Sequence, residues 1–301
     1  MQHIRGTQTL AGTTAAGIIC NGGQHFYTRV ELYENGTANC WELVDPEGLQ
    51  ARIASGWLTC NVPSGKVLSI HGLGAYQIGE AQWLHDTQSY EKELLARLRS
   101  LNPDSSLWER PTSSLGELGK QTHSVPILPS AELYGSPVEG RSLSLFRRVG
   151  DQVILSELTL YADGRAALYS EQEEVYGHLD DVMQRLDRGE LTAQLEMPAR
   201  VQIPGLGTVV FTQALYEVEH AEKRKEIEEE MTKAQGGETA FEACKKAYVD
   251  YLIEPTERAR QRLREAYEKV PEHRRMFLGS MDNKDEDYQR IIYFPEQKRE
   301  V

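Results

Sequence analysis

The sequence predicts an α+β fold with two tandem duplicated ββαβββ-like units, built on antiparallel sheets and followed by a helical C-terminal region. Three observations predict this fold. Short sequence blocks recur in the same order, each copy carries the same succession of hairpin, helix and strand signals, and the chain becomes more charged beyond about residue 213. The expected division is a first unit (1–101), a Pro/Gly/Ser-rich linker (102–140), a second unit (141–212) and a helical region with a closing strand (213–301).

The recurring blocks are related by two offsets. Residues 32–36 (LYENG) and 160–164 (LYADG) lie 128 positions apart, whereas two later pairs of blocks lie 133 positions apart. The later pairs are Gly56-Trp57-Leu58-Thr59 with Gly189-Glu190-Leu191-Thr192, and Leu68 to Gly74 with Val201 to Gly207. Three blocks in one order, with a single five-residue change of spacing between them, indicate duplication of a small unit.

Each unit is expected to start with a hairpin. Asn35-Gly36 and Asp163-Gly164 are strong hairpin dipeptides, because both of their positions accept a positive φ. The predicted flanking strands cover 25–33 and 37–44 in the first copy, and 152–161 and 165–169 in the second. A helix is predicted next, at 46–55 and at 176–188, with a glycine at its end. Further strands follow, the last of them after the Gly-Leu-Gly turns at 72–74 and 205–207.

The remaining segments are predicted mainly helical. Apolar spacing predicts a helix over 89–101, and the linker after it is rich in proline. The segment 214–233 predicts a charged helix whose central turns, 222–230, stay exposed. Two further helices, at 238–253 and 255–270, each carry one apolar stripe that must be buried. Residues 289–294 predict a closing strand.

Composition excludes several classes of protein. The chain has 301 residues, 40% hydrophobic and 26% charged, with no apolar run long enough to span a membrane and no apolar core of a signal peptide. Four cysteines without CxxC spacing favour reduced thiols and a cytoplasmic protein. The net charge of −13 argues against binding to nucleic acid or to an anionic membrane. It is compatible with a basic protein partner, or simply with solubility.

The motifs of common enzymes are missing from the sequence. Neither Gly-Leu-Gly has the third glycine of a dinucleotide-binding loop, and no G-x-S-x-G or phosphate-binding loop pattern occurs. No cofactor and no metal are therefore expected. If the protein is an enzyme, the residues to test first are His25, His71, Asp45 and Tyr27, since the predicted sheet brings the two histidines near one another, with Cys20 or Asp45 close by.

Two further groups are candidates for binding. Asp282, Asp285, Glu286 and Asp287 form an acidic loop that lacks calcium-loop spacing, and this loop could contact a cationic partner. Trp41 and Trp57 fall in or beside predicted strands, so we expect them in the core. An exposed tryptophan would instead mark an interface, because tryptophan is enriched at binding hot spots.

Two stretches resemble uncharacterised bacterial domain families. The first stretch comprises Gly12-Thr13-Thr14-Ala15-Ala16-Gly17-Ile18-Ile19-Cys20, His25-Phe26-Tyr27-Thr28, Leu32-Tyr33-Glu34 and Cys40-Trp41. The second stretch, within the last 40 residues, comprises 267–275, 279–285 and 291–293. The resemblance implies a bacterial accessory protein of the toxin-immunity or defence type rather than a housekeeping enzyme. It supplies no catalytic residues.

Three hypotheses about function follow. The first is a non-catalytic acidic protein that binds a protein partner, such as an immunity or defence-associated protein covering a basic surface. The second is an enzyme with a cryptic site at the interface of the two repeats. The third is a structural subunit of a larger complex, bridged by the charged helix at 214–233. The sequence leaves the oligomeric state open.

Overall fold

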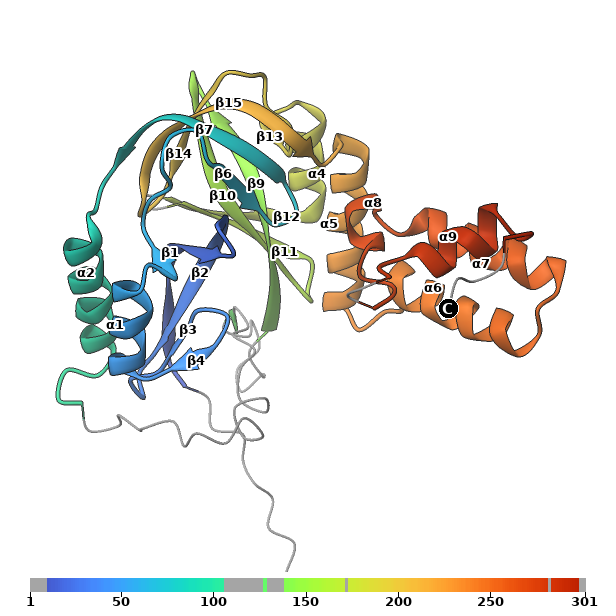
Figure 1. Cartoon of the computed structure of the whole chain (residues 1–301), viewed down its shortest axis with the longest axis horizontal. Helices are drawn as coiled ribbons and strands as arrows, with labels where there is room; N and C mark the ends of the chain where they lie inside the picture. Colours follow the sequence, from blue (N-terminus) through green and yellow to red (C-terminus); the bar gives the residue numbers. More distant parts are fainter. Residues whose placement is uncertain (1–9, 106–126, 129–137, 171–172, 281–282, 298–301) are drawn as a thin grey trace, which may run out of the picture. The chain divides into compact units, whose positions relative to one another are not determined.

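The computed structural model describes residues 10–105, 127–128, 138–170, 173–280 and 283–297. The chain forms two compact units. The first takes its described residues from 1–124, 149–155 and 196–216, and the second from 125–148, 156–195 and 217–301. Strands and helices occur in both, so the predicted α+β class is confirmed (Figure 1). Most of the predicted linker lies outside the described residues.

The first copy of the repeat contains seven strands and two helices among its described residues. In chain order they are β1 (Gly12–Asn21), β2 (Gln24–Tyr33), β3 (Ala38–Asn39), β4 (Leu43–Val44), α1 (Pro46–Ala54), β5 (Leu58–Thr59), β6 (Val67–Ile70), β7 (Gly74–Trp83) and α2 (Thr87–Leu101). Helices α1 and α2 contact one another, and α2 packs on β1 and β2 (Figure 1).

The second copy repeats this order after the short strand β8 (Ile127–Leu128). Its elements are β9 (Val138–Val149), β10 (Gln152–Tyr161), β11 (Arg165–Ser170), β12 (Glu173–His178), α4 (Leu179–Asp187), β13 (Leu191–Thr192), β14 (Ala199–Ile203), β15 (Gly207–Glu217) and α5 (His220–Ala234). Strand β10 starts and ends 128 residues after β2, and α4 starts and ends 133 residues after α1. The same offset of 133 relates α5 to α2. The predicted similarity of the two halves is therefore confirmed in their order of elements.

Strand pairing follows the same rule in both copies. The register pair Ile18–Thr59 of β1 and β5 corresponds to Phe146–Thr192 of β9 and β13. Likewise, β2 pairs with β6, and β10 with β14, at positions related by the two offsets. The final strands of the copies, β7 and β15, pair with each other in the first unit. Duplication accounts for this agreement, because unrelated chains would not share both order and register.

The sequence analysis predicts antiparallel sheets, but the sheet in the structure is mixed. The pairs β2–β6 and β10–β14 are parallel, whereas the adjoining pairs β6–β7 and β14–β15 are antiparallel. A parallel pair requires a crossover connection, and the segments containing α1 and α4 provide it. The sequence pattern predicts where the strands lie but not which strands pair with one another.

The repeated glycines occupy equivalent turns, as predicted. Gly36 and Gly164 have φ of 83° and 89°, and Gly56 and Gly189 both have φ of 72°. A side chain with a Cβ atom is strained in this left-handed region, which glycine enters freely. The duplicated sequence blocks therefore preserve backbone conformations.

The helical C-terminal region contains α6 (Ala240–Ile253), α7 (Glu257–Lys269), α8 (Glu272–Arg275) and α9 (Glu286–Tyr293). The two helices predicted at 238–253 and 255–270 are confirmed. The predicted closing strand at 289–294 is wrong, because most of that segment belongs to α9. In α9 the side chains of Tyr288, Ile291 and Ile292 are buried, which is the three- and four-residue spacing of one helix face.

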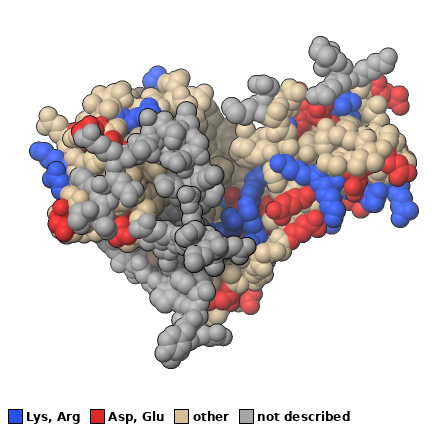
Figure 2. Space-filling view, turned by 90° about the horizontal axis from the view of Figure 1, so that it is seen from below, with Lys and Arg blue, Asp and Glu red and all other residues tan. Residues whose placement is uncertain are grey.

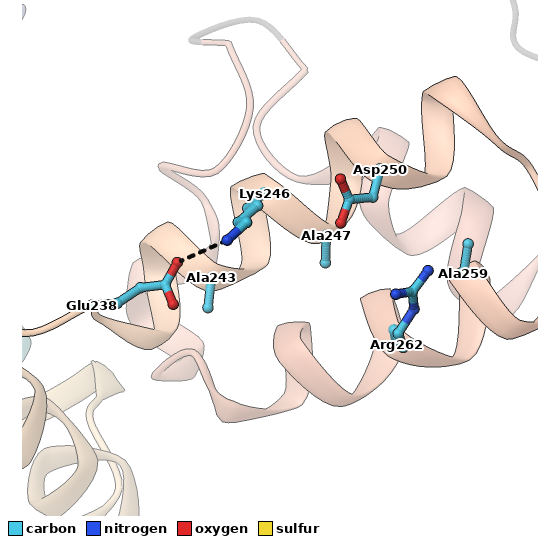
Figure 3. Close-up of a pocket in the computed structure, with 7 residues that line it drawn as sticks. All are labelled: Glu238, Ala243, Lys246, Ala247, Asp250, Ala259 and Arg262. Atoms are coloured by element: carbon cyan, nitrogen blue, oxygen red, sulfur yellow. Dashed lines mark ion pairs between the residues drawn. The ribbon is translucent and has the colours of Figure 1, made fainter.

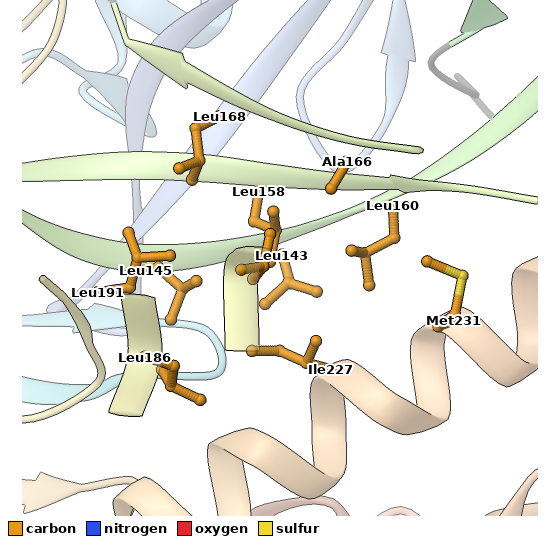
Figure 4. Close-up of a cluster of buried hydrophobic side chains, with 11 residues drawn as sticks. Leu143, Leu145, Leu158, Leu160, Ala166, Leu168, Leu186, Leu191, Ile227 and Met231 are labelled. Carbon is orange, nitrogen blue, oxygen red and sulfur yellow. The ribbon is translucent and has the colours of Figure 1, made fainter. Parts of the chain in front are cut away.

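Two apolar clusters stabilise the second unit. One joins leucines of β9 and β10 to Leu186 of α4 and to Ile227 and Met231 of α5 (Figure 4). The other lies within the helical region and is built on Cys244, Leu263, Tyr267 and Tyr288, with Phe241, Tyr248 and Tyr251 packed against it. The apolar stripes of α6 and α7 are therefore packed, as predicted.

Candidate binding surface

The residues proposed for catalysis come from different elements of the first unit. His25 and Tyr27 lie two positions apart on β2, so they share one face, and Cys20 is the register partner of His25 on β1. His71 is exposed in the turn between β6 and β7. Asp45 is the N-cap of α1, and its Oδ1 accepts a 2.7 Å hydrogen bond from the Gly48 amide. The Asp45 carboxylate therefore has a structural task at the start of a helix.

Burial decides the ionisation of the β2 pair. It lowers the pKa of His25, with a smaller contribution from Lys66, so this imidazole is neutral at pH 7. It also raises the pKa of Tyr27. Within the described residues, no group of three or more His, Cys, Asp or Glu side chains is placed to hold a metal ion.

The predicted acidic loop overlaps a helix, because Glu286 and Asp287 belong to α9 and Asp285 is its N-cap. Asp285 accepts a 2.5 Å hydrogen bond from the Tyr267 hydroxyl, and Asp287 forms an ion pair of 3.2 Å with Arg290. Glu286 is exposed, and Asp282 lies outside the described residues. Figure 2 shows basic and acidic side chains intermixed over the described residues of the helical region, with no extended patch of one sign among them.

Trp41 stands at the tip of the hairpin between β3 and β4. The register pair Asn39–Leu43 leaves a loop of three residues, 40–42, with Trp41 at its centre. Trp41 has φ of 71° and is 54% exposed, which contradicts its predicted place in the core. Glycine is the usual residue at the left-handed position of such a loop, and any other side chain costs about 1–2 kcal/mol there. The hairpin therefore exposes a large aromatic side chain although the backbone conformation of that residue is unfavourable.

Two other aromatic rings contact the ring of Trp41. Its ring centroid lies 5.4 Å from that of Phe26 and 6.2 Å from that of Trp57, the second contact being edge-to-face. The Arg52 guanidinium stacks 4.9 Å from the centroid of Trp57 and pairs with the Glu42 carboxylate. We call these five residues the aromatic patch. All five belong to the first unit.

The thiol next to Trp41 contributes no reactivity. Cys40 is fully buried, and burial raises its pKa to about 11. A thiol with this pKa stays protonated at neutral pH and is a poor nucleophile. The exposed chemistry of the patch is therefore that of an indole ring and a carboxylate.

The second copy provides an internal comparison for the patch. The two offsets bring Phe26 to Ile154, Arg52 to Arg185 and Trp57 to Glu190. There, Arg185 forms a 3.2 Å ion pair with Glu190, where the first copy has a guanidinium stacked on an indole ring. Since the second copy builds the same helix, glycine cap and strand without these rings, the fold itself does not require an aromatic patch. A role in binding explains it better than a role in folding.

Helix α5 contradicts the prediction that its central turns are exposed. Lys223, Glu226 and Glu229 are 0%, 5% and 6% exposed. Lys223 Nζ lies 2.8 Å from Glu226 Oε2, and His273 Nε2 of α8 lies 3.3 Å from the same oxygen. Buried charges persist only when they are paired, and here Lys223 pairs with Glu226 within α5, while Arg274 of α8 pairs with Glu229.

The glutamates of α5 also hold the starts of two helices. Glu229 Oε1 accepts a 2.8 Å hydrogen bond from the Phe241 amide at the start of α6, and Glu222 Oε2 accepts one of 2.6 Å from the Glu272 amide at the start of α8. Arg274 adds ion pairs of 3.3 Å to Glu229 and 2.7 Å to Glu230. Carboxylates are favourable at helix N-termini, where amide groups lack intrahelical partners. We call this set of contacts the α5 junction.

Electrostatics in the junction follow from burial and pairing. Burial alone would raise the pKa of Glu226, but the charge of Lys223 and the contact with His273 outweigh it and lower the pKa to about 2. Burial lowers the pKa of Lys223, and the Glu226 carboxylate opposes that shift. Glu226 is a carboxylate at neutral pH, and the charged form of each side chain favours the charged form of the other.

One signal in the sequence could have predicted that one face of α5 is buried. The offset of 133 brings Leu94 and Leu98 of α2 to Ile227 and Met231 of α5, and all four side chains are buried. It also brings Tyr90 to Lys223, both of them buried. Extending the repeat through this helix would have predicted an apolar stripe against the sheet. It would not have predicted the buried charges.

A small hollow lies between α6 and α7. Three alanines, at 243, 247 and 259, form its floor, and Glu238, Lys246, Asp250 and Arg262 surround it (Figure 3). Glu238 and Lys246 form an exposed ion pair of 3.9 Å. The alternating charges select no particular ligand, so we assign this hollow no function.

Comparisons with known proteins identify domain families rather than an activity. Searches of curated proteins and of solved structures returned no match. Among the described residues, no helix is long and apolar enough to cross a membrane.

A family described as a domain of unknown function, DUF7638, matches residues 1–105 and 130–238, and another so described, DUF7639, matches residues 239–300. The predicted membership of uncharacterised families is thus confirmed without any function attached to it. The boundary after residue 238 falls between the two helices that Glu229 connects, α5 and α6. The chain belongs to the DUF7638 family and carries a DUF7639 domain at its C-terminal end.

Proposed function

We propose that this chain is a non-catalytic binding protein that engages a protein partner through the aromatic patch. The observation that carries the proposal is Trp41, a half-exposed tryptophan held at φ of 71° on a hairpin tip. Unfavourable backbone conformations persist where a function requires them, and tryptophan is the residue most enriched at the centres of protein interfaces.

The internal duplication supports the same conclusion. Three rings gather in the first copy, whereas the positions equivalent to Phe26 and Trp57 hold Ile154 and Glu190 in the second copy. A structural requirement would act on both copies alike. The proposal therefore assigns one such binding surface to each chain.

The finer form of the proposal is a bacterial immunity or defence-associated protein that covers a basic partner. Its support is the net charge of −13 and the sequence resemblance to bacterial accessory domains. Complementary charge would speed the encounter of such a pair and disfavour wrong partners. Four free cysteines are compatible with a reducing compartment, and we propose a cytoplasmic location on that basis.

The test compares two surface variants as baits in cells that express the protein naturally. Trp41→Gly removes the ring and relieves the left-handed strain, whereas Leu84→Ala trims a side chain of the same unit that is 61% exposed. Cross-linking of each bait, followed by mass spectrometry, measures partner capture. We expect one dominant protein partner with the wild-type and Leu84→Ala baits and its loss with Trp41→Gly.

The contrary result is equally clear. If Trp41→Gly captures the same partner as fully as the wild type, the patch is not the binding surface. If no protein partner is captured and the purified chain turns over a substrate, the binding function itself is wrong.

A further inference from the structure

Within the aromatic patch, a cationic side chain of the chain itself already contacts an indole ring and a carboxylate. The Arg52 guanidinium lies over the ring of Trp57 and is paired with the Glu42 carboxylate. An indole face combined with a carboxylate is a favourable environment for a planar cation, because the ring attracts positive charge and the carboxylate accepts hydrogen bonds. The chain thus uses one of its own arginines as an occupant of this kind of site.

A second indole ring lies beside this site, and the carboxylate that pairs with Arg52 is itself partly exposed. Trp41 is 54% exposed, and the side chain of Glu42, the next residue, is 53% exposed. The Trp41 ring is supported by Phe26 and Trp57, so its position is determined before a partner arrives. A ring held in place loses little conformational entropy on binding.

Charge discriminates among the possible occupants. An acidic side chain would meet both the negative face of the indole ring and the Glu42 carboxylate, in a chain of net charge −13. A purely apolar side chain would contact the ring but would gain nothing from the Glu42 carboxylate, which is half-exposed although it pairs with Arg52. A cationic side chain is attracted by both groups.

We infer that the partner presents an arginine or lysine side chain to the exposed face of Trp41, with its charge against Glu42. This inference rests on the proposed function, since it names the chemistry by which the same patch recognises its partner. The macromolecule is a protein with a basic surface.

The probe is a short Gly/Ser peptide with one central arginine, compared with peptides that carry citrulline, leucine or glutamate at that position. Citrulline has nearly the shape of arginine but no charge. The readout is the NMR signal of the Trp41 indole N–H during titration of the full chain with each peptide. An exposed cation–π contact favours the arginine peptide over citrulline by about 2–5-fold in Kd.

Three variants locate the effect. Trp41→Leu retains an apolar side chain at the same backbone position, and its indole signal is replaced as a readout by shifts of neighbouring amides. Glu42→Gln removes the carboxylate charge, and Glu80→Gln, an exposed glutamate on β7, is the matched control. We expect Trp41→Leu and Glu42→Gln each to abolish the preference for arginine, and Glu80→Gln to retain it.

The outcomes separate this inference from the proposed function. Equal binding of the arginine, citrulline and leucine peptides, or no shift of the Trp41 signal with any of them, overturns the cationic occupant. Partner capture that still depends on Trp41 would then leave the proposed function standing. An arginine preference that survives in Trp41→Leu would also contradict the inference, because the cation would be bound elsewhere.

Discussion

Replacing Glu226 with glutamine tests the α5 junction most directly. The substitution keeps the size of the side chain and removes only its charge. It removes the carboxylate charge that lies 2.8 Å from the ammonium of the fully buried Lys223 and 3.3 Å from His273. Removing one partner of a buried ion pair costs about 3–5 kcal/mol, because the other charge stays desolvated.

The pKa of Glu226 gives a second estimate of how much its charge contributes to the free energy of unfolding. Its value falls from the ordinary 4.5 to about 2 in the folded protein. At 1.36 kcal/mol for each pKa unit, the charged form of Glu226 stabilises the fold by about 3 kcal/mol. Because the folded pKa is the lower one, this stabilisation is fully present above about pH 4.5 and is lost as the pH falls towards about 2.

The assay is urea unfolding of the wild type and three variants at pH 7 and at pH 3. The matched control is Glu228→Gln, an exposed position on the same helix, which should cost less than about 0.5 kcal/mol. The double variant Lys223→Met/Glu226→Leu replaces both charges with apolar side chains, so it should be more stable than Glu226→Gln alone. Acidification should destabilise the wild type more than it destabilises Glu226→Gln.

Two results would refute this reasoning. If Glu226→Gln and Glu228→Gln have equally small effects, the charges of the α5 junction are solvated and α8 does not cover them. If the wild type and Glu226→Gln lose stability in parallel on acidification, Glu226 does not carry the acid sensitivity of this region.

Three further predictions concern the patch, the repeated turns and the helical region. Trp41→Gly should change the free energy of unfolding by less than about 1 kcal/mol, because relief of about 1–2 kcal/mol of backbone strain offsets the lost ring contacts; a large drop in thermal stability would show that the ring is structural. Gly207→Ala should destabilise far more than Gly189→Ala in chemical denaturation, since an added Cβ would lie 2.2 Å from the Gln82 carbonyl oxygen at the first site and meets nothing within 4 Å at the second; equal costs would contradict this packing. Tyr248→Ala removes the ring stacked 4.2 Å from that of Tyr288 and should cost about 2–3 kcal/mol, seen as a lower Tm; an unchanged Tm would mean that α6 does not depend on this contact.

Part of the candidate site was predictable from the pattern of residues and part was not. The statement that an exposed tryptophan would mark an interface was available from composition alone. The exposure of Trp41 depends on a φ of 71° in a three-residue loop. The sequence of the loop does not indicate this conformation, because glycine is the residue expected there. The catalytic candidates were chosen by residue type, and such a choice could not show that the Asp45 carboxylate caps a helix.

The error at the C-terminal end has a similar origin. Ile291-Ile292-Tyr293 is a short run of β-favouring residues, and such a run does not distinguish a strand from one face of a helix. Packing against Leu263 and Tyr267 selects the helix, because Tyr288, Ile291 and Ile292 all reach the same apolar cluster only at helical spacing. Tertiary contact overrode local propensity here.

The sequence by itself determined the duplication, the order of elements in both copies and the positions of their glycine turns, because these features depend on local backbone chemistry that recurs at fixed offsets. Only the tertiary structure decided which strands pair in parallel, where Trp41 lies and how Lys223 and Glu226 are buried. The physical reason is that burial and charge pairing depend on residues distant in sequence: His273 and Arg274 reach α5 only after α6 and α7 have folded the chain back onto it.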